Sequence, residues 1–133
     1  MTGRYFVDTS AWFALVNRSD PDHERISKLL QENRGRLVTT NFVFDETVTI
    51  CRSRLGHGTA VRVGEALLDS VVVDLIRATP GDETRAWDLF RGRQDKPYSY
   101  TDCVSFTMMR RLGVDTAIAL DDDFRQEGFD ARP

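Results

Sequence analysis

Short apolar segments alternate along this chain with longer segments that have the periodicity of helices. The expected strands cover residues 4–7, 37–40, 71–75 and 116–120, with a short final strand around Phe129. The expected helices cover residues 11–16, 21 to near 35, 42–55, 59–70, 82–91 and 100–112. This alternation favours an α/β fold with a largely parallel central sheet flanked by helices.

The whole chain, residues 1–133, is expected to form one domain, because its length is close to the commonest domain size. No internal repeat, linker or low-complexity tract divides it. Hydrophobic residues make up 41% of the chain, which is enough for a core. The net charge of -3 argues against a general nucleic-acid coat protein, which would be basic. This net charge is still compatible with an enzyme that cuts nucleic acid and has its acidic residues concentrated at a metal site.

No targeting or membrane signal is expected. The first apolar stretch, Tyr5-Phe6-Val7, is too short for a signal-peptide core or a membrane-spanning helix. Cys51 and Cys103 lie in separate expected helices, without a Cys-x-x-Cys pair. A reduced, cytoplasmic protein is the simplest interpretation.

Capping residues indicate where several helices begin. Asp20 precedes Pro21, which suits a cap followed by the first helical position. Asn41 can cap the helix of residues 42–55, and Ser99 can cap the helix that ends at Leu112. Gly56 and Gly113 then follow the last turns of these two helices, as helix-ending glycines do.

Asp8 and Asp121 are each the first charged residue after an apolar strand. Parallel sheets bind ligands outside the carboxyl ends of their strands, so both acids are expected at the same edge of the sheet. Each also has an ordinary explanation. Asp8 can cap the next helix, and the run of residues 121–123 can be a solvated turn.

Glu46 shares a helix face with the apolar residues Phe42, Val43 and Ile50, whereas Asp45 points elsewhere. A buried, unpaired carboxylate costs several kcal/mol unless it is neutralised or finds a cation. An arginine or a backbone amide could supply that partner, and so could a metal.

Asp102 follows Ser99 by three positions, as in a capping box, and its negative charge suits the first turn of a helix. Phe106 and Met109 place Asp102 on an apolar side of the helix as well.

The four acids are harder to explain together than singly. Carboxylates that are drawn together repel one another, and their pKa values rise unless cations enter. An all-oxygen cluster suits Mg²⁺ or Mn²⁺, which can activate water and orient a phosphodiester. Other catalytic patterns are missing from the sequence: His23 and His57 stand alone, no phosphate-binding Gly-x-x-x-x-Gly-Lys loop occurs, and Ser10 has no obvious histidine base.

Four segments resemble the motifs of the PIN-domain family and occur in the family's order. They are Phe6-Val7-Asp8-Thr9-Ser10, residues 38–47 with Glu46 as the acid, Tyr98-Ser99-Tyr100-Thr101-Asp102, and residues 118–124 with Asp121 as the acid. The resemblance covers nearly the whole chain. One departure is Ala119, since the family often has Thr or Ser two residues before its last acid.

The resemblance implies a single PIN-like domain that acts as a Mg²⁺- or Mn²⁺-dependent endoribonuclease on single-stranded RNA. Asp8, Asp102 and Asp121 would be its metal ligands. Glu46 would complete the ligand set or position the attacking water. These four acids are the expected catalytic residues.

The resemblance also implies supporting residues and partners. Ser10, Thr101 and Asp123 are the candidates for contacts that hold the ligands in place. Many similar proteins are VapC-type toxins of type II toxin–antitoxin pairs. They tend to be homodimers that a small antitoxin protein holds inactive.

Two groups of cations could hold RNA phosphates. Arg52, Arg54 and Arg62 form one group, and Arg91, Arg93 and Lys96 form the other. Cations are also favoured at helix ends for electrostatic reasons alone.

Two other functions remain open from the sequence. A phosphotransfer or receiver-type α/β module also places an aspartate after its first strand. However, Ser10 stands where such a phosphatase needs a second acid, and Lys96 precedes a helix rather than following a strand. A non-catalytic binding domain would use the acids only as caps and ion pairs. Thermal stabilisation by Mn²⁺ that Asp8→Asn abolishes would separate a metal enzyme from such a domain.

Overall fold

A five-stranded sheet forms the centre of this computed structural model, which describes residues 3–33 and 35–133. The strands within those residues are β1 (Tyr5–Val7), β2 (Leu37–Thr40), β3 (Val73–Ile76), β4 (Thr116–Ile118) and β5 (Asp130–Arg132). Their order is β3-β2-β1-β4-β5, and every pair of neighbours is parallel. The predicted α/β fold with a parallel sheet is therefore confirmed.

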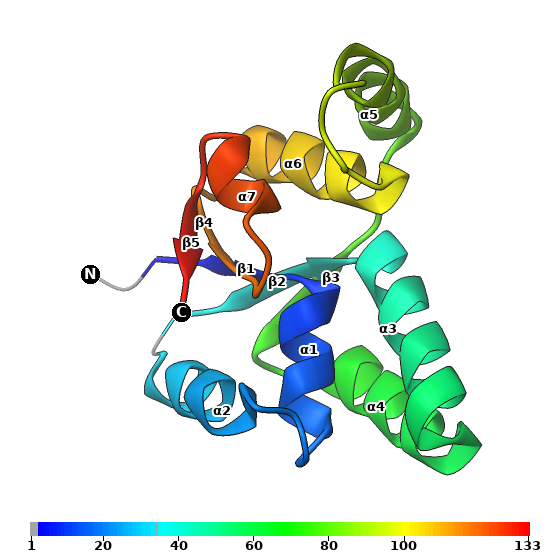
Figure 1. Ribbon diagram of the computed structural model, residues 1–133, viewed down its shortest axis with the longest axis vertical. Helices are drawn as coiled ribbons and strands as arrows, with labels where there is room; N and C mark the ends of the chain where they lie inside the picture. Colours follow the sequence, from blue (N-terminus) through cyan, green and yellow to red (C-terminus); the bar gives the residue numbers. More distant parts are fainter. Residues whose placement is uncertain (1–2, 34) are drawn as a thin grey trace.

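Helices cover both faces of the sheet. They are α1 (Thr9–Val16), α2 (His23–Glu32), α3 (Asn41–Leu55), α4 (His57–Asp69), α5 (Pro80–Gly92), α6 (Tyr100–Leu112) and α7 (Asp123–Gln126). Figure 1 shows α1, α2 and α4 on one side of the sheet and α6 and α7 on the other, with α5 packed on the outside of α6. In the described residues, no helix combines the length and the apolar character needed to cross a membrane.

The core consists of the apolar strands and the helix faces that pack on them. On the side of α6 and α7, Phe124 lies between Phe6 and Phe106, with ring centroids 6.0 Å and 5.0 Å away. On the other side, Trp12 of α1 and Ile26 of α2 are buried. All four residues of β2 are also buried, as expected for a strand in the interior of a covered sheet.

Two helix starts differ from the prediction because the predicted cap residues make other contacts. Asp20 Oδ1 accepts the N–H of Asp22 at 2.8 Å and forms a separate turn, so α2 begins at His23 rather than at Pro21. The cap of α3 is Thr40, whose Oγ1 accepts the N–H of Val43 at 3.1 Å. Asn41 was the predicted cap.

Other boundaries shift by a few residues. Ser70 Oγ accepts the N–H groups of Val72 and Val73, and this turn delays β3 to Val73. In the same way Leu120 donates its N–H to Ser10 Oγ rather than to a neighbouring strand, and β4 ends at Ile118. Further shifts are an earlier start of α1 at 9, of α4 at 57 and of α5 at 80, and a final strand at 130–132 just after Phe129.

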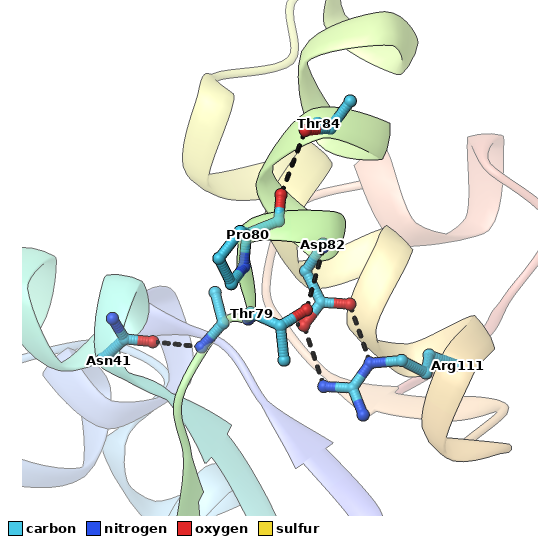
Figure 2. A network of polar contacts seen from close by, with 7 residues as sticks. Asn41, Thr79, Pro80, Asp82, Thr84 and Arg111 are labelled. Atoms are coloured by element: carbon cyan, nitrogen blue, oxygen red, sulfur yellow. Dashed lines mark hydrogen bonds and ion pairs between the residues drawn. The ribbon is translucent and has the colours of Figure 1, made fainter.

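A polar network attaches α5 to α6 and to the start of α3 (Figure 2). Thr79 and Asp82 form a capping box at the start of α5. The Asp82 side chain is fully buried, and Arg111 of α6 donates to both of its oxygens at 2.7 Å and 2.8 Å. Asn41 Oδ1 accepts the N–H of Ala78 at 2.8 Å. These contacts fix the position of α6, whose first turn carries Asp102.

Candidate metal centre

The four predicted acids come from four elements that meet at the carboxyl edge of the sheet. Asp8 directly follows β1, and Asp121 follows the adjacent strand β4, where Val7 and Ile118 are paired. Asp102 lies in the first turn of α6, and Glu46 lies in the second turn of α3. The parallel arrangement of β1 and β4 explains why Asp8 and Asp121 reach the same edge.

Asp8 is a buried carboxylate that also caps α1. Only 4% of the residue is exposed, and its Oδ2 accepts hydrogen bonds from the Ser10 hydroxyl at 2.8 Å and the Ser10 N–H at 3.3 Å. Burial raises the pKa of Asp8 to about 7, although the Ser10 hydrogen bond acts in the opposite direction. The charges of Asp121 and Asp102 raise this pKa further. The site therefore disfavours the ionised form of Asp8 unless a cation is present.

Asp102 keeps its capping role and contributes to the same electrostatic cluster. Its Oδ2 accepts the Ser99 N–H at 2.9 Å, while Ser99 Oγ accepts the Asp102 N–H at 3.0 Å. Burial raises the pKa of Asp102 to about 6, and the nearby charges of Asp121 and Asp123 add to this effect. The cap uses Oδ2 alone, which leaves Oδ1 for another ligand.

The acidic run after β4 has two different surroundings. Asp121 is exposed, and its Oδ1 accepts the N–H of Asp123 at 3.2 Å. Asp123 is half-buried, and burial together with the charge of Asp121 raises its pKa. Asp122 instead contacts Arg125 at 3.4 Å and is largely exposed. Asp121 and Asp123 thus belong to the cluster, whereas Asp122 faces solvent.

Glu46 joins the site through a hydroxyl group. The Thr9 Oγ1 donates a 2.7 Å hydrogen bond to Glu46 Oε1, and the Glu46 side chain is half-buried rather than enclosed. The expected apolar face is only partly closed: Val43 is buried, while Phe42 and Ile50 are half-buried. The structure therefore groups Asp8, Asp102 and Asp121 by charge, and it connects Glu46 to them through the residue next to Asp8.

The candidate supporting residues differ in what they contact. Ser10 holds Asp8 and also accepts the Leu120 N–H at 3.1 Å, so it joins the ends of β1 and β4. This hydroxyl lies close to Ala119, where the sequence lacks the Thr or Ser that many family members have. Thr101 is half-buried in the first turn of α6, and its hydroxyl makes no hydrogen bond within residues 3–33 and 35–133. Thr9 was missed by sequence reasoning, although it stands between two predicted site residues.

The donor set fits a hard divalent cation. All candidate ligands are carboxylate oxygens, and their burial and mutual repulsion raise the pKa values of Asp8 and Asp102. In the part of the chain that the structure describes, no three acidic, histidine or cysteine side chains already enclose a metal-sized site. The cluster supplies the right atoms and charge, and the exposed Asp121 is the member with most freedom to turn toward an ion.

The fold and the cluster together define a class: a doubly covered parallel α/β domain with acidic groups at the carboxyl edge of its sheet. The sequence matches the PIN domain family over residues 5–129. The chain belongs to the PIN-domain family.

Several relatives resemble the chain over most of its length. The "23S rRNA-specific endonuclease VapC20" of Mycobacterium tuberculosis is 37% identical over 129 residues, which are 96% of this chain and 98% of the relative. A "VapC ribonuclease" of Archaeoglobus fulgidus is 27% identical over 111 residues, which are 80% and 70% of the two chains.

Solved structures agree with this relationship. The crystal structure of VapC20, described as a "Sarcin-Ricin loop cleaving toxin", has a TM-score of 0.90, 35% identity and 96% coverage of both chains. VapBC2 from Rickettsia felis, solved with a promoter DNA fragment, has a TM-score of 0.71 and 98% coverage of both chains. Its 10% identity shows a common fold only.

Proposed function

We propose that this protein is a VapC-type endoribonuclease that hydrolyses phosphodiester bonds of single-stranded RNA with Mg²⁺ or Mn²⁺. The observation that carries this proposal is the burial of the Asp8 carboxylate beside Asp121 and Asp102: burial raises the pKa of Asp8, and the charges of Asp121 and Asp102 raise it further. Such a cluster at a strand edge is unfavourable without a cation and suited to one. The 37% identity with a ribonuclease over nearly the full length of both chains supports the same activity.

Asp8, Asp102 and Asp121 would hold the metal, with Asp123 beside them. The bound ion would supply positive charge that polarises the phosphodiester and stabilises the leaving oxygen. Ser10 orients Asp8, and the Ser99 N–H orients Asp102. Each hydrogen bond holds one carboxylate oxygen in place, as groups that contact metal ligands usually do.

Glu46 would position the attacking water or complete the ligand set. Thr9 occupies Oε1, so Oε2 is the oxygen available to accept a proton from the water. The water oxygen would then bond to phosphorus while the bond from phosphorus to the leaving oxygen breaks, and a proton from solvent would complete the leaving hydroxyl. General-base assistance of this kind typically contributes a factor of about 10²–10⁴.

The relatives guide the choice of substrate and partners. Because VapC20 is named for 23S rRNA and for the sarcin–ricin loop, 23S rRNA is the first substrate to test. We place the protein in the cytoplasm as the toxin of a type II pair, a homodimer inhibited by a small antitoxin. The two buried cysteines, which are free thiols, agree with a reducing compartment.

The alternative of a receiver domain is disfavoured. Lys96 lies in the loop after α5 and not after a strand, where a receiver domain places its lysine.

The test is cleavage of 23S rRNA by the purified protein, with Mg²⁺, Mn²⁺ or EDTA. Wild type should cut with either ion and stop with EDTA. Asp8→Asn and Asp102→Asn should remove activity, whereas Asp122→Asn, a neighbouring acid that faces solvent, should retain it. A folded Asp102→Asn variant that still cleaves at the wild-type rate would contradict the proposed site. Retained cleavage in EDTA would contradict the metal requirement.

A further inference from the structure

A groove beside Glu46 extends the candidate metal centre along α3. Its volume is about 540 Å³, and it is lined by Thr9 from α1 and by Asp45, Glu46, Thr49, Ile50, Ser53 and Arg54 from α3. We call it the α3 groove. Pockets that hold small ligands have volumes of roughly 300–1,000 Å³, so the groove has room for a ligand about the size of a nucleotide.

The helical repeat explains how one element lines the groove. Glu46, Ile50 and Arg54 are separated by four residues each and share a face of α3, and Thr49 and Ser53 form a parallel row beside them. Glu46 and Arg54 are eight residues apart, which corresponds to about 12 Å along the helix axis. One end of the groove is therefore anionic and the other cationic.

The other arginines that are candidates for phosphate binding already contact side chains. Arg52 contacts His57, Arg62 donates to the Thr59 hydroxyl at 3.1 Å, Arg91 pairs with Asp88, and Arg93 pairs with the buried Glu127. Within residues 3–33 and 35–133, Arg54 forms no ion pair, although it lines a cavity that Glu46 also lines. Its charge is thus available to a ligand in the groove.

We propose that the α3 groove binds an RNA phosphate next to the one that is cleaved. Arg54 would contact this phosphate directly, and the hydroxyl groups of Thr49 and Ser53 would donate hydrogen bonds to its oxygens. Ile50, between Glu46 and Arg54 in the first row, offers an apolar surface for the ribose. The proposal rests on the ribonuclease activity proposed above, because Glu46 marks the end of the groove at which the RNA is cut.

The chemistry of the lining favours a phosphodiester chain. Arginine and hydroxyl groups are common donors to phosphate oxygens, and such contacts position a nucleic acid without reading its bases. An isolated anion would be repelled by the acids at the far end. A chain that places one phosphate at the metal and a nearby phosphate at Arg54 would satisfy both ends at once.

Arg54→Ala tests the proposal, with Arg52→Ala as a matched control from the same last turn of α3. Binding of a fluorescein-labelled single-stranded 23S rRNA fragment is measured in the inactive Asp102→Asn background over a range of salt concentrations. Arg54→Ala should weaken binding about five- to tenfold and lower the slope of log K against log salt by about 0.7, as expected for one lost phosphate contact. Arg52→Ala should stay within about twofold of its parent, because its guanidinium already contacts His57.

Steady-state cleavage gives a second readout. Arg54→Ala in the otherwise wild-type protein should lower kcat/KM, mainly through a higher KM, as loss of uniform binding does. Thr49→Val with Ser53→Ala should weaken RNA binding in the same direction. If the wild-type protein cleaves RNA but Arg54→Ala and Arg52→Ala bind RNA equally well, the groove proposal alone is overturned. If the wild-type protein does not cleave RNA but RNA binding depends on Arg54, the groove proposal is supported and the proposed ribonuclease activity is overturned.

Discussion

The Ser10 hydroxyl donates a 2.8 Å hydrogen bond to Oδ2 of Asp8. The same hydroxyl accepts the N–H of Leu120 at 3.1 Å, so a single oxygen connects the segment after β1 with the segment after β4. Asp8 and Asp121 belong to these two segments. The distance between two candidate metal ligands therefore depends on a residue that is not itself a ligand.

Ser10→Ala should weaken both metal binding and the fold. The loss of two partly buried hydrogen bonds, to Asp8 and from Leu120, should cost roughly 2 kcal/mol of stability. Loss of a group that holds a metal ligand typically lowers metal affinity about 10–100-fold. Isothermal titration with Mn²⁺ and urea denaturation measure the two effects. Ser19→Ala, in the exposed turn after α1, is the control, and equal Mn²⁺ affinity in both variants would refute the role of Ser10.

Asp8→Asn should stabilise the metal-free protein at neutral and basic pH. The folded-state pKa of Asp8, about 7, lies above its ordinary value of 3.8, so wild type loses stability as the pH rises from about 4 to about 7. The asparagine keeps a capping oxygen but carries no charge. The gain should reach at most about 4 kcal/mol above pH 7, since one pKa unit corresponds to about 1.4 kcal/mol, and should shrink toward pH 4.

Urea denaturation in EDTA across this pH range measures the difference, and Asp122→Asn serves as the control. Adding Mn²⁺ should reverse the order at pH 8, because the ion stabilises wild type and not Asp8→Asn. If Asp8→Asn is less stable than wild type at pH 8 without metal, the charge of Asp8 does not destabilise the folded protein.

Asp82 should have the opposite pH dependence. The hydrogen bonds from Arg111 hold the pKa of the buried Asp82 at about 2, below its ordinary value of 3.8. Its contribution to stability, about 2 kcal/mol, is present above about pH 4 and is lost as the pH falls toward 2. Asp82→Asn should therefore be destabilising near pH 6, with a smaller effect near pH 2.5, in urea denaturation.

The exposed pair of Asp74 and Arg36 provides the comparison for that experiment. Asp74→Asn should change stability by only about 0–1 kcal/mol, because solvent screens the pair. If Asp82→Asn and Asp74→Asn had equal effects at every pH, the burial of Asp82 would have no energetic consequence.

Thr9→Val should reduce catalysis by leaving Glu46 without its hydrogen bond. The valine keeps the shape of threonine but cannot donate to Glu46 Oε1, a contact of 2.7 Å in wild type. We expect kcat to fall about tenfold or more, the typical effect of removing a group that orients a ligand or base. Thr9→Ser keeps the donor and should retain most of the activity. Single-turnover cleavage of 23S rRNA measures the rate, and equal rates for the two variants would exclude this role.

The sequence determined the class of fold and the four elements that carry the candidate site. Runs of β-branched and apolar residues such as Leu37–Thr40 favour buried strands, and helices between such strands favour parallel crossovers. The capping box of Ser99 and Asp102 also follows from local spacing. Local spacing was insufficient at the starts of α2 and α3. Asp20 accepts the Asp22 N–H in a turn that precedes α2, and Asn41 accepts the N–H of the distant Ala78.

The tertiary structure alone decided which acids influence one another and which polar groups support them. The contacts of Thr9 with Glu46, Ser10 with Leu120 and Arg111 with Asp82 join residues 37, 110 and 29 positions apart. The raised pKa of Asp8 and the lowered pKa of Asp82 likewise depend on burial and on charges from other elements. A sequence pattern records the order of residues and their periodicity, whereas desolvation and Coulomb interactions depend on distances through space that exist only after the strands and helices have packed.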